Sequence, residues 1–283
     1  MARIILKIML ATLTQFALLR HYTDASRNRT RFRSPVLGRK PGNRAVGVLF
    51  RQIVAKRSIK MLFSVWDYSV LTIEIFSDVI CPWCYIGKRR LDQVLNSPTG
   101  EGVEVRWRPF QLYPSVPSQG WDRAEFIRRR YGVDADPGRV PTRIDEEAKQ
   151  AGLVFNYRAI RRLPSTLLAH RLLEFAVPQG IQHALAEVLF AGYFCHGEDV
   201  GDLATLIRLA GQVGIVGDDV ASALAGGFAE EEVAAQLRRA TDVGVSGVPG
   251  YLMGGGFLLP GAQSVDTMQQ IIARAKVRLG KPD

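Results

Sequence analysis

The chain has 283 residues, of which 47% are hydrophobic and 23% are charged, and its formal net charge is +10. This length and composition agree with one enzyme-sized globular domain and an extension. Residues 1–70 hold 14 Lys or Arg and only two acids, a net charge of +12, whereas residues 71–283 have a net charge of −2. The basic charge therefore belongs to the N-terminal segment, and we expect no nucleic-acid partner for the rest of the chain.

Residues 1–70 form a basic N-terminal extension that has three interpretations. Its apolar stretch 4–19 faintly resembles a signal peptide, although Lys7 interrupts it and no small-residue cleavage site follows. The arginines between residues 27 and 33 would instead suit an organellar transit peptide. The third interpretation is that the native chain starts at Met61. We favour this or a disordered tail, because residues 31–44 contain few acids and scattered Gly and Pro.

No membrane span is expected either, because stretch 4–19 is shorter than about 18 uninterrupted apolar residues. Without a clear signal, we expect a cytoplasmic location. A catalytic cysteine pair does not require an oxidising compartment.

The most informative segment is Cys81-Pro82-Trp83-Cys84. It follows an apolar run, 71–76, that predicts a strand, and it precedes a helix-like stretch, 85–95. A strand, two cysteines separated by two residues, and a helix are the arrangement used for dithiol redox chemistry. The first cysteine would lie at the helix N-terminus, where free N–H groups and the helix dipole stabilise an anion. Proline is accepted in the first helical turn, where its missing N–H has no helical partner.

Such a cysteine pair has two structural alternatives, an inert pair of core cysteines and metal binding. The inert pair poorly explains Pro-Trp in a strand-to-helix turn. Structural zinc needs four ligands, usually in two close pairs. The remaining cysteine, Cys195, is followed directly by His196, which is not the usual ligand spacing. We therefore expect no metal, and we interpret Cys195 as a small buried apolar side chain on a helix.

The rest of the chain predicts a mixed α/β order. An alternating strand at 103–107 is followed by a loop, by helices with apolar residues spaced three and four apart, and by a hairpin around Gly254-Gly255-Gly256. A final helix starts after Ser264, which is a suitable cap. The predicted helices are 121–130, 144–151, 168–175, 181–189, 203–210, 233–240 and 265–279, and the predicted hairpin strands are 251–253 and 257–260.

Four segments together resemble the DsbA-like thiol–disulfide oxidoreductases of the FrnE type. These are the run 77–87 around the cysteines, the segment 107–112, the segment 163–172, and the loop 244–250 with the sequence Gly-Val-Ser-Gly-Val-Pro-Gly. The resemblance covers residues 71–276. It implies an α/β fold, namely a thioredoxin-like domain made of 71–112 and 243–283 and split by an inserted all-helical domain at 113–242.

The resemblance also implies roles for particular residues. Cys81 would attack a disulfide and Cys84 would resolve the mixed disulfide. Pro82 and Trp83 would shape the turn, and Trp83 either lines a substrate groove or only packs the helix start. Pro249 would follow a cis bond and present the Val248 backbone to substrate.

Two further residues, His170 and Glu74, each have one functional and one structural interpretation. His170 would contact substrate across the cleft between the domains, or would be an ordinary packed helix residue. Glu74 interrupts the apolar strand before the cysteines. If it is buried, its pKa would be raised and it could relay a proton to Cys84. If it faces solvent at a sheet edge, it has no such role.

Two function classes follow. The first is a thiol–disulfide oxidoreductase that acts on protein or small-molecule thiols and disulfides without a bound cofactor. The second is a glutathione-dependent isomerase or transferase of the hydroxychromene-carboxylate isomerase or kappa type. The related proteins of the second class typically carry serine at the first cysteine position, so Cys81 and Cys84 together favour the first. Glutathione is a candidate substrate in both, and the sequence leaves a homodimer open.

Overall fold

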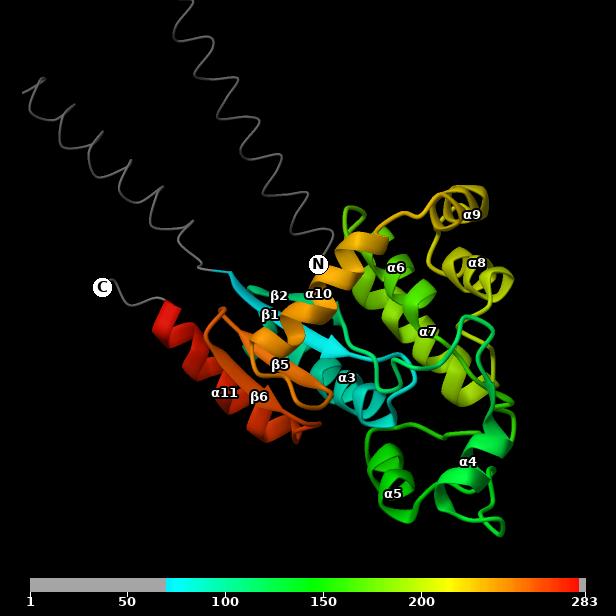
Figure 1. Ribbon diagram of the computed structural model, residues 1–283. Coiled ribbons are helices and arrows are strands. Elements are labelled where there is room, and N and C mark those ends of the chain that lie inside the picture. The colour runs from blue at the N-terminus through cyan, green and yellow to red at the C-terminus, as the bar shows by residue number, and fades with distance from the viewer. Residues whose placement is uncertain (1–69, 280–283) are drawn as a thin grey trace, which may run out of the picture. The chain divides into compact units, whose positions relative to one another are not determined.

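Four strands form one mixed sheet in the order β2-β1-β5-β6 (Figure 1). The computed structural model describes residues 70–279. In it, β1 (Leu71–Ser77) pairs in parallel with β2 (Val103–Pro109) and antiparallel with β5 (Gly250–Met253), and β6 (Phe257–Pro260) pairs antiparallel with β5. A strand inside a sheet is covered on both faces and needs an almost continuous apolar run. This position explains the sequence of β1 and confirms the predicted strand.

Alternate residues of β1 face two different layers of helices. Leu71, Ile73 and Ile75 belong to the main apolar core, together with residues of α3 (Pro82–Leu95) and α11 (Val265–Leu279). Phe76 packs instead with Ala240 of α10 (Glu230–Asp242). Because successive side chains of a strand point to opposite faces, α3 and α11 cover one face of the sheet and α10 covers the other.

The chain between β2 and β5 is helical apart from one short ladder. The ladder pairs β3 (Trp121–Asp122) with β4 (Arg162–Leu163) in antiparallel register. Helices α6, α7, α8 and α9 pack against one another in chain order, whereas α5 packs against α3 (Figure 1). The helices before α10 are α4 (Arg123–Tyr131), α5 (Thr142–Gln150), α6 (Leu167–Phe175), α7 (Gln182–His196), α8 (Leu203–Gly211) and α9 (Gly217–Ala225).

The differences from the predicted elements lie at helix starts, in short elements and at the end of α7, which reaches His196 instead of residue 189. The first helix begins at Pro82 rather than at residue 85, and the helix predicted to start at residue 121 begins at Arg123. Residues 121 and 122 pair with β4 instead, and the Asp122 carboxylate accepts the Glu125 N–H at 2.7 Å. Helix α9 and the ladder were not predicted, because two-residue strands have no period and α9 buries only Val220 and Leu224.

The final helix is confirmed with its cap, since the Ser264 hydroxyl accepts the Thr267 N–H at 3.2 Å. The predicted domain boundaries at residues 113 and 242 stay predictions. The interpretations of residues 1–69 lie outside the described residues.

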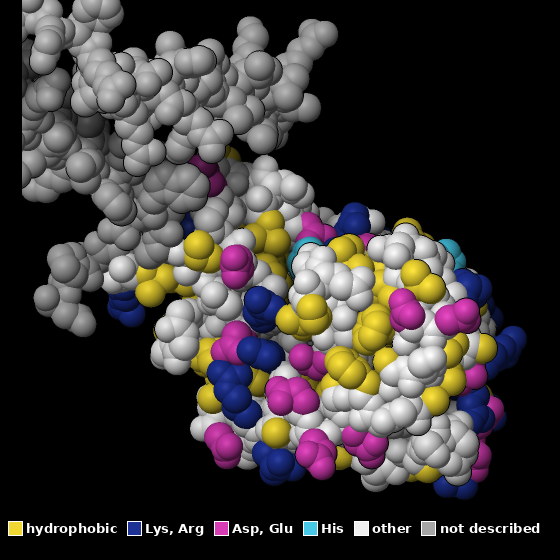
Figure 2. Space-filling view, turned by 90° about the horizontal axis from the view of Figure 1, so that it is seen from above, with side chains coloured by type: hydrophobic (Ala, Val, Ile, Leu, Met, Phe, Trp, Pro, Cys, Tyr) yellow, Lys and Arg dark blue, Asp and Glu magenta, His cyan; other side chains and the backbone are white. Residues whose placement is uncertain are grey.

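On the face shown in Figure 2, Lys and Arg side chains are interspersed with Asp and Glu. Neither sign gathers into one large patch there. Within residues 70–279, no helix has the length and apolar character that crossing a membrane would require.

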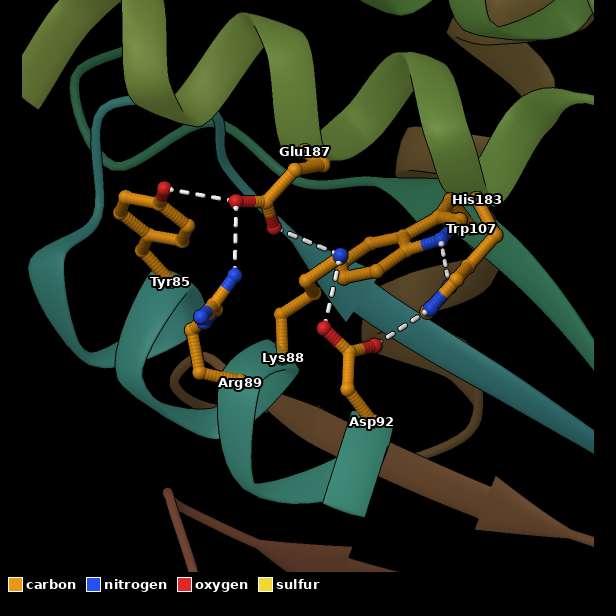
Figure 3. A network of polar contacts seen from close by, with 7 residues as sticks. All are labelled: Tyr85, Lys88, Arg89, Asp92, Trp107, His183 and Glu187. Carbon is orange, nitrogen blue, oxygen red and sulfur yellow. Dashed lines mark hydrogen bonds and ion pairs between the residues drawn. The ribbon is translucent and has the colours of Figure 1, made fainter. Parts of the chain in front are cut away.

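An ion-pair network joins α3 to α7 (Figure 3). The Lys88 side chain is only 5% exposed, and its ammonium lies 2.9 Å from the Asp92 carboxylate and 2.6 Å from the Glu187 carboxylate. Glu187 comes from α7 and also accepts the Tyr85 hydroxyl at 2.8 Å and the Arg89 guanidinium at 3.2 Å. One nearly buried cation therefore neutralises two carboxylates from two helices.

His183 extends this network to the sheet (Figure 3). Its Nδ1 accepts the Trp107 indole N–H at 3.1 Å, and its Nε2 lies 2.7 Å from Asp92 Oδ1. A neutral imidazole with its proton on Nε2 satisfies both contacts. Burial opposes ionisation of Asp92, but hydrogen bonds from His183 and Lys88 outweigh it and hold the pKa of Asp92 below its usual value. The network therefore connects α3, α7 and β2.

Replacing Lys88 by Met tests how much this network stabilises the fold. The substitution leaves Asp92 and Glu187 without their shared cation, so we expect the free energy of unfolding to fall by about 2–3 kcal/mol. This is below the range for fully buried pairs, because both carboxylates are partly exposed. Urea unfolding of the full chain measures the change.

Lys149→Met is the matched control, because Lys149 pairs with Asp145 on an exposed helix surface. It should cost less than about 1 kcal/mol. Equal losses in the two variants would mean that the buried network has no special contribution.

Candidate active site

Cys81 lies at the end of the turn that connects β1 to α3. The strand ends at Ser77, three residues form the turn, and Cys81 is the N-cap of α3 with Pro82 in the first turn. The backbone carbonyl of Cys81 accepts the Cys84 N–H at 3.1 Å. The sequence pattern therefore forms the predicted strand–dithiol–helix unit, and both cysteines are free thiols.

The loop before β5 meets this turn from the other end of the chain. The Val248–Pro249 peptide bond is cis, as the resemblance implied. The Cys81 thiol donates to the Val248 carbonyl oxygen at 3.7 Å. The Pro249 carbonyl accepts the Gly261 N–H at 2.7 Å, which fixes the start of the hairpin. The structure thus brings together Cys81, Val248 and Pro249 from two distant segments.

The two sulfurs have different surroundings. Both are buried, with Cys81 3% exposed at the N-cap of α3 and Cys84 1% exposed in the first turn of that helix. Burial, followed by the hydrogen bond and charge of Cys81, raises the pKa of Cys84 well above its usual value. Contacts with Ser77 and the Asp78 backbone oppose this shift. Cys84 is therefore held as a neutral thiol behind Cys81.

Asp78 is a buried carboxyl group in the turn between β1 and Cys81. Its Oδ2 accepts the Leu112 N–H at 2.8 Å, and its Oδ1 lies 3.5 Å from the Ile80 nitrogen. Burial raises the pKa of Asp78 to about 7, against the lowering effect of these N–H donors. The sequence interpretation gave Asp78 no role, although a carboxylate three residues before Cys81 in an apolar segment was a visible signal.

His170 lies beside Asp78 as a packed helix residue, so of its two interpretations the contact with substrate is wrong. The His170 side chain is 2% exposed, its Nε2 bonds the Phe110 carbonyl at 3.0 Å, and it lies 3.9 Å from Asp78 Oδ1. Burial lowers the pKa of His170 to about 4, so the ring is neutral at pH 7. His170 therefore packs behind the turn instead of facing a cleft.

The predicted raised pKa of Glu74 is also wrong. Burial favours the neutral form, but hydrogen bonds from Arg239 and Arg108 outweigh it and lower the pKa of Glu74. Its two oxygens lie 2.7 Å and 2.6 Å from these guanidinium groups. Glu74 pairs with Leu252 and shares the face that α10 covers, whereas Cys84 lies on α3 across the sheet. Glu74 is thus an ionised partner of two arginines and no proton relay.

Tyr251 is a further neighbour of the dithiol that the sequence did not indicate. It is 1% exposed on β5, and its hydroxyl has no hydrogen-bond partner among the described residues. Burial, and then the proximity of Cys84 and Cys81, raises the pKa of Tyr251 well above its usual value. The hydroxyl stands over Gly87 of α3, where an added Cβ would overlap it. Gly87 therefore lets β5 and α3 approach closely behind the sulfurs.

Two further residues from the sequence analysis are Trp83, next to the cysteine pair, and the third cysteine, Cys195. Trp83 is half-buried, and the Arg143 guanidinium carbon lies 5.5 Å from its ring centre. Cys195 is half-buried near the end of α7, where burial raises its pKa and a hydrogen bond from Tyr85 opposes this. In residues 70–279, no three His, Cys, Asp or Glu side chains are grouped so that they could hold a metal ion.

The fold and the dithiol define a thioredoxin-like protein with a helical insertion. Residues 72–273 match the family model of the DSBA-like thioredoxin domain. The chain belongs to this family, which confirms the resemblance and the predicted fold class.

Named relatives agree with this assignment. The protein YwbO of Bacillus subtilis (strain 168) is 28% identical over 202 residues, which are 71% of this chain and 95% of YwbO. The crystal structure of a probable DsbA oxidoreductase from Streptomyces coelicolor is similar with a TM-score of 0.65 and 28% identity, covering 75% of this chain and 92% of that one. A 2-hydroxychromene-2-carboxylate isomerase shares the fold with a TM-score of 0.53 and 14% identity, covering 72% of this chain and 95% of that one.

Asp78→Asn should change how stability depends on pH. Folding raises the pKa of Asp78 from 3.8 to about 7, so the folded state holds the proton that the unfolded state releases. Stability contributed by this proton is complete below pH 3.8 and is lost as pH rises to 7. The variant lacks this loss, so its stability relative to wild type should improve by up to about 4 kcal/mol between pH 4 and 8. Urea unfolding at several pH values measures the difference, and a constant difference would contradict the expectation.

Gly87→Ala should destabilise the site by overlap with Tyr251. We expect a loss of about 1–3 kcal/mol despite the better helix propensity of alanine. Adding Tyr251→Phe removes the overlapping hydroxyl and should recover most of this loss in thermal unfolding. Gly211→Ala on α8 meets open space and is the control, with no loss expected. An unchanged cost in the double variant would show that the hydroxyl is not the obstacle.

Proposed function

We propose that this protein is a thiol–disulfide oxidoreductase that exchanges disulfides with protein or small-molecule thiols through Cys81 and Cys84. The observation that carries the proposal is the asymmetry of the pair. Cys81 caps α3 beside the Val248 carbonyl, whereas Cys84 is buried behind it with a raised pKa. Two-step exchange needs one sulfur that attacks and a second thiol close by that resolves the mixed disulfide.

The reaction has two displacement steps. In the reducing direction, the Cys81 thiolate attacks one sulfur of the substrate disulfide, and the other substrate sulfur leaves as a thiolate. Cys84 then loses its proton and attacks Cys81 Sγ, which releases the second substrate thiolate. The pair gives up two electrons and two protons and becomes a disulfide. Oxidation of a dithiol substrate is the same sequence reversed.

Family membership supports a redox enzyme in general. The exchange partner, the redox direction and the cytoplasmic location are parts of the proposal. Glutathione remains a candidate small-molecule partner, and no bound cofactor is required by this chemistry. A glutathione-dependent isomerase or transferase is the competing outcome of the test below.

Titration of the full chain in glutathione redox buffers tests the proposal. After thiol trapping, mass measurement should show one reversible two-electron transition. Cys81→Ser and Cys84→Ser should each abolish it, because either change removes one sulfur of the pair. Cys195→Ser is the matched control and should leave it unchanged, since Cys195 lies near the end of α7 and not in the turn that carries the pair.

The midpoint then gives the direction. A value near −270 mV, about that of thioredoxin, favours a reductase, whereas about −120 mV, as in DsbA, favours an oxidant. A stable glutathione complex without a reversible disulfide would refute the proposal and favour the isomerase or transferase class.

A further inference from the structure

A cavity of about 620 Å³ opens beside Cys81 and extends into the helical insertion. Ile80 and Pro82, the two neighbours of Cys81 in the chain, form part of its wall. The remaining wall comes mainly from α4, α5, the loops that connect them, and the end of α7. Its volume lies within the range of about 300–1,000 Å³ that is typical of small-molecule sites. The cavity therefore begins at the two residues that flank Cys81, although Cys81 itself is not part of the wall.

Six of the twenty residues that line the cavity are aromatic. Phe126 packs edge-on against Tyr113 with ring centres 5.1 Å apart, and Tyr157, Tyr193 and Phe194 continue the wall. Flat apolar rings favour a ligand with an aromatic body, which can stack or pack edge-to-face on them.

One buried cation lies in this aromatic wall. Arg123 is 8% exposed, its guanidinium carbon lies 4.8 Å from the centre of the Tyr157 ring, and its Nη1 donates to the Pro137 carbonyl. Among residues 70–279, no carboxylate lies within ion-pair distance of Arg123. Buried arginines normally have an acidic partner, and a guanidinium binds a carboxylate with two parallel hydrogen bonds. A ligand carboxylate would supply that partner.

The charges at the rim restrict the ligand further. Asp134, Asp136 and Arg139 line the exposed mouth of the cavity. Asp136 accepts the Gly138 N–H at 2.8 Å and lies 3.7 Å from the Arg158 guanidinium, so part of its charge is already engaged. Two acids against one arginine at the mouth disfavour a bound half that carries more than one negative charge. The cavity therefore suits an aromatic body with a single carboxylate.

We propose that this cavity binds the aromatic, singly carboxylated half of a small-molecule disulfide or thiol, with Arg123 as the specificity-determining residue. The inference rests on the proposed function, because the bound half presents its sulfur to Cys81. Exchange then follows the same two displacements. The reduced pair transfers two electrons, and two aromatic thiolates leave while the Cys81–Cys84 disulfide forms.

Two aromatic disulfides test the proposal. Dithiobis(nitrobenzoate) carries one carboxylate on each ring, whereas dipyridyl disulfide carries none. Stopped-flow oxidation of the reduced full chain gives a half-saturation concentration and a maximal rate for each. In Arg123→Met we expect the half-saturation concentration for the carboxylated disulfide to rise about 10- to 100-fold, the loss typical of a charged hydrogen bond. The value for dipyridyl disulfide should stay within about twofold of wild type.

Arg128→Met is the matched control, because Arg128 lies on the same helix, is exposed and does not line the cavity. It should leave both disulfides unaffected. Arg123→Lys keeps the charge but loses the planar fork, and it should give an intermediate rise. This second variant decides the question if circular dichroism shows that Arg123→Met is not folded.

The failures of the two proposals are distinguishable. If wild type fails to form the Cys81–Cys84 disulfide with either compound, the proposed function is wrong. If both compounds oxidise the pair but Arg123→Met and Arg123→Lys change neither half-saturation value, or change both equally, the pocket proposal is wrong and the proposed function stands.

Discussion

The hydrogen bonds of β1 to both of its neighbours hold the site together. Pairing with β2 on one side and β5 on the other places the end of β1 next to the start of β5. The turn after β1 carries Cys81, and the residues just before β5 are Val248 and Pro249. Register in a sheet is fixed by which face each side chain must bury, so a slip of one residue would turn the apolar side chains of β1 to the wrong layers. The contact between Cys81 and the Val248 carbonyl depends on this register.

The turn that carries Cys81 is organised around an internal polar group. Asp78 accepts the N–H of Leu112 and so links the turn to the chain leaving β2. His170 of α6 contacts the same segment after β2 through its hydrogen bond to the Phe110 carbonyl. Burial favours the neutral form of both groups and shifts the pKa of Asp78 up and that of His170 down. These hydrogen bonds connect the turn to the chain that leaves β2 and to α6.

The helical insertion faces α3 and its preceding turn on two sides, and the two sides differ in chemical character. On the α7 side, Lys88 and the carboxylates of Asp92 and Glu187 form a nearly buried ion-pair network. On the α4 and α5 side, the aromatic cavity with Arg123 lies beside the turn. The first is a satisfied polar contact that fixes the insertion to the dithiol helix. The second leaves a buried cation without an acidic partner, and ligand binding would complete it.

The sequence by itself determined most of the elements and the candidate dithiol, but not α9 or the β3–β4 ladder. Local patterns were sufficient for β1, the dithiol at the start of α3, the Gly-rich hairpin and the final helix, because each depends on residues close together in the chain. The resemblance of separate segments to a known family predicted the cis bond before Pro249. Tertiary structure decided the surroundings of the sulfurs. The sequence left open whether Glu74 is a buried acid or an edge residue, and the structure shows it paired with Arg108 and Arg239. It also left open whether His170 faces a cleft, and the structure shows it bonded to the Phe110 carbonyl. Charge state and exposure depend on neighbours from distant segments, and only the folded chain brings those neighbours together.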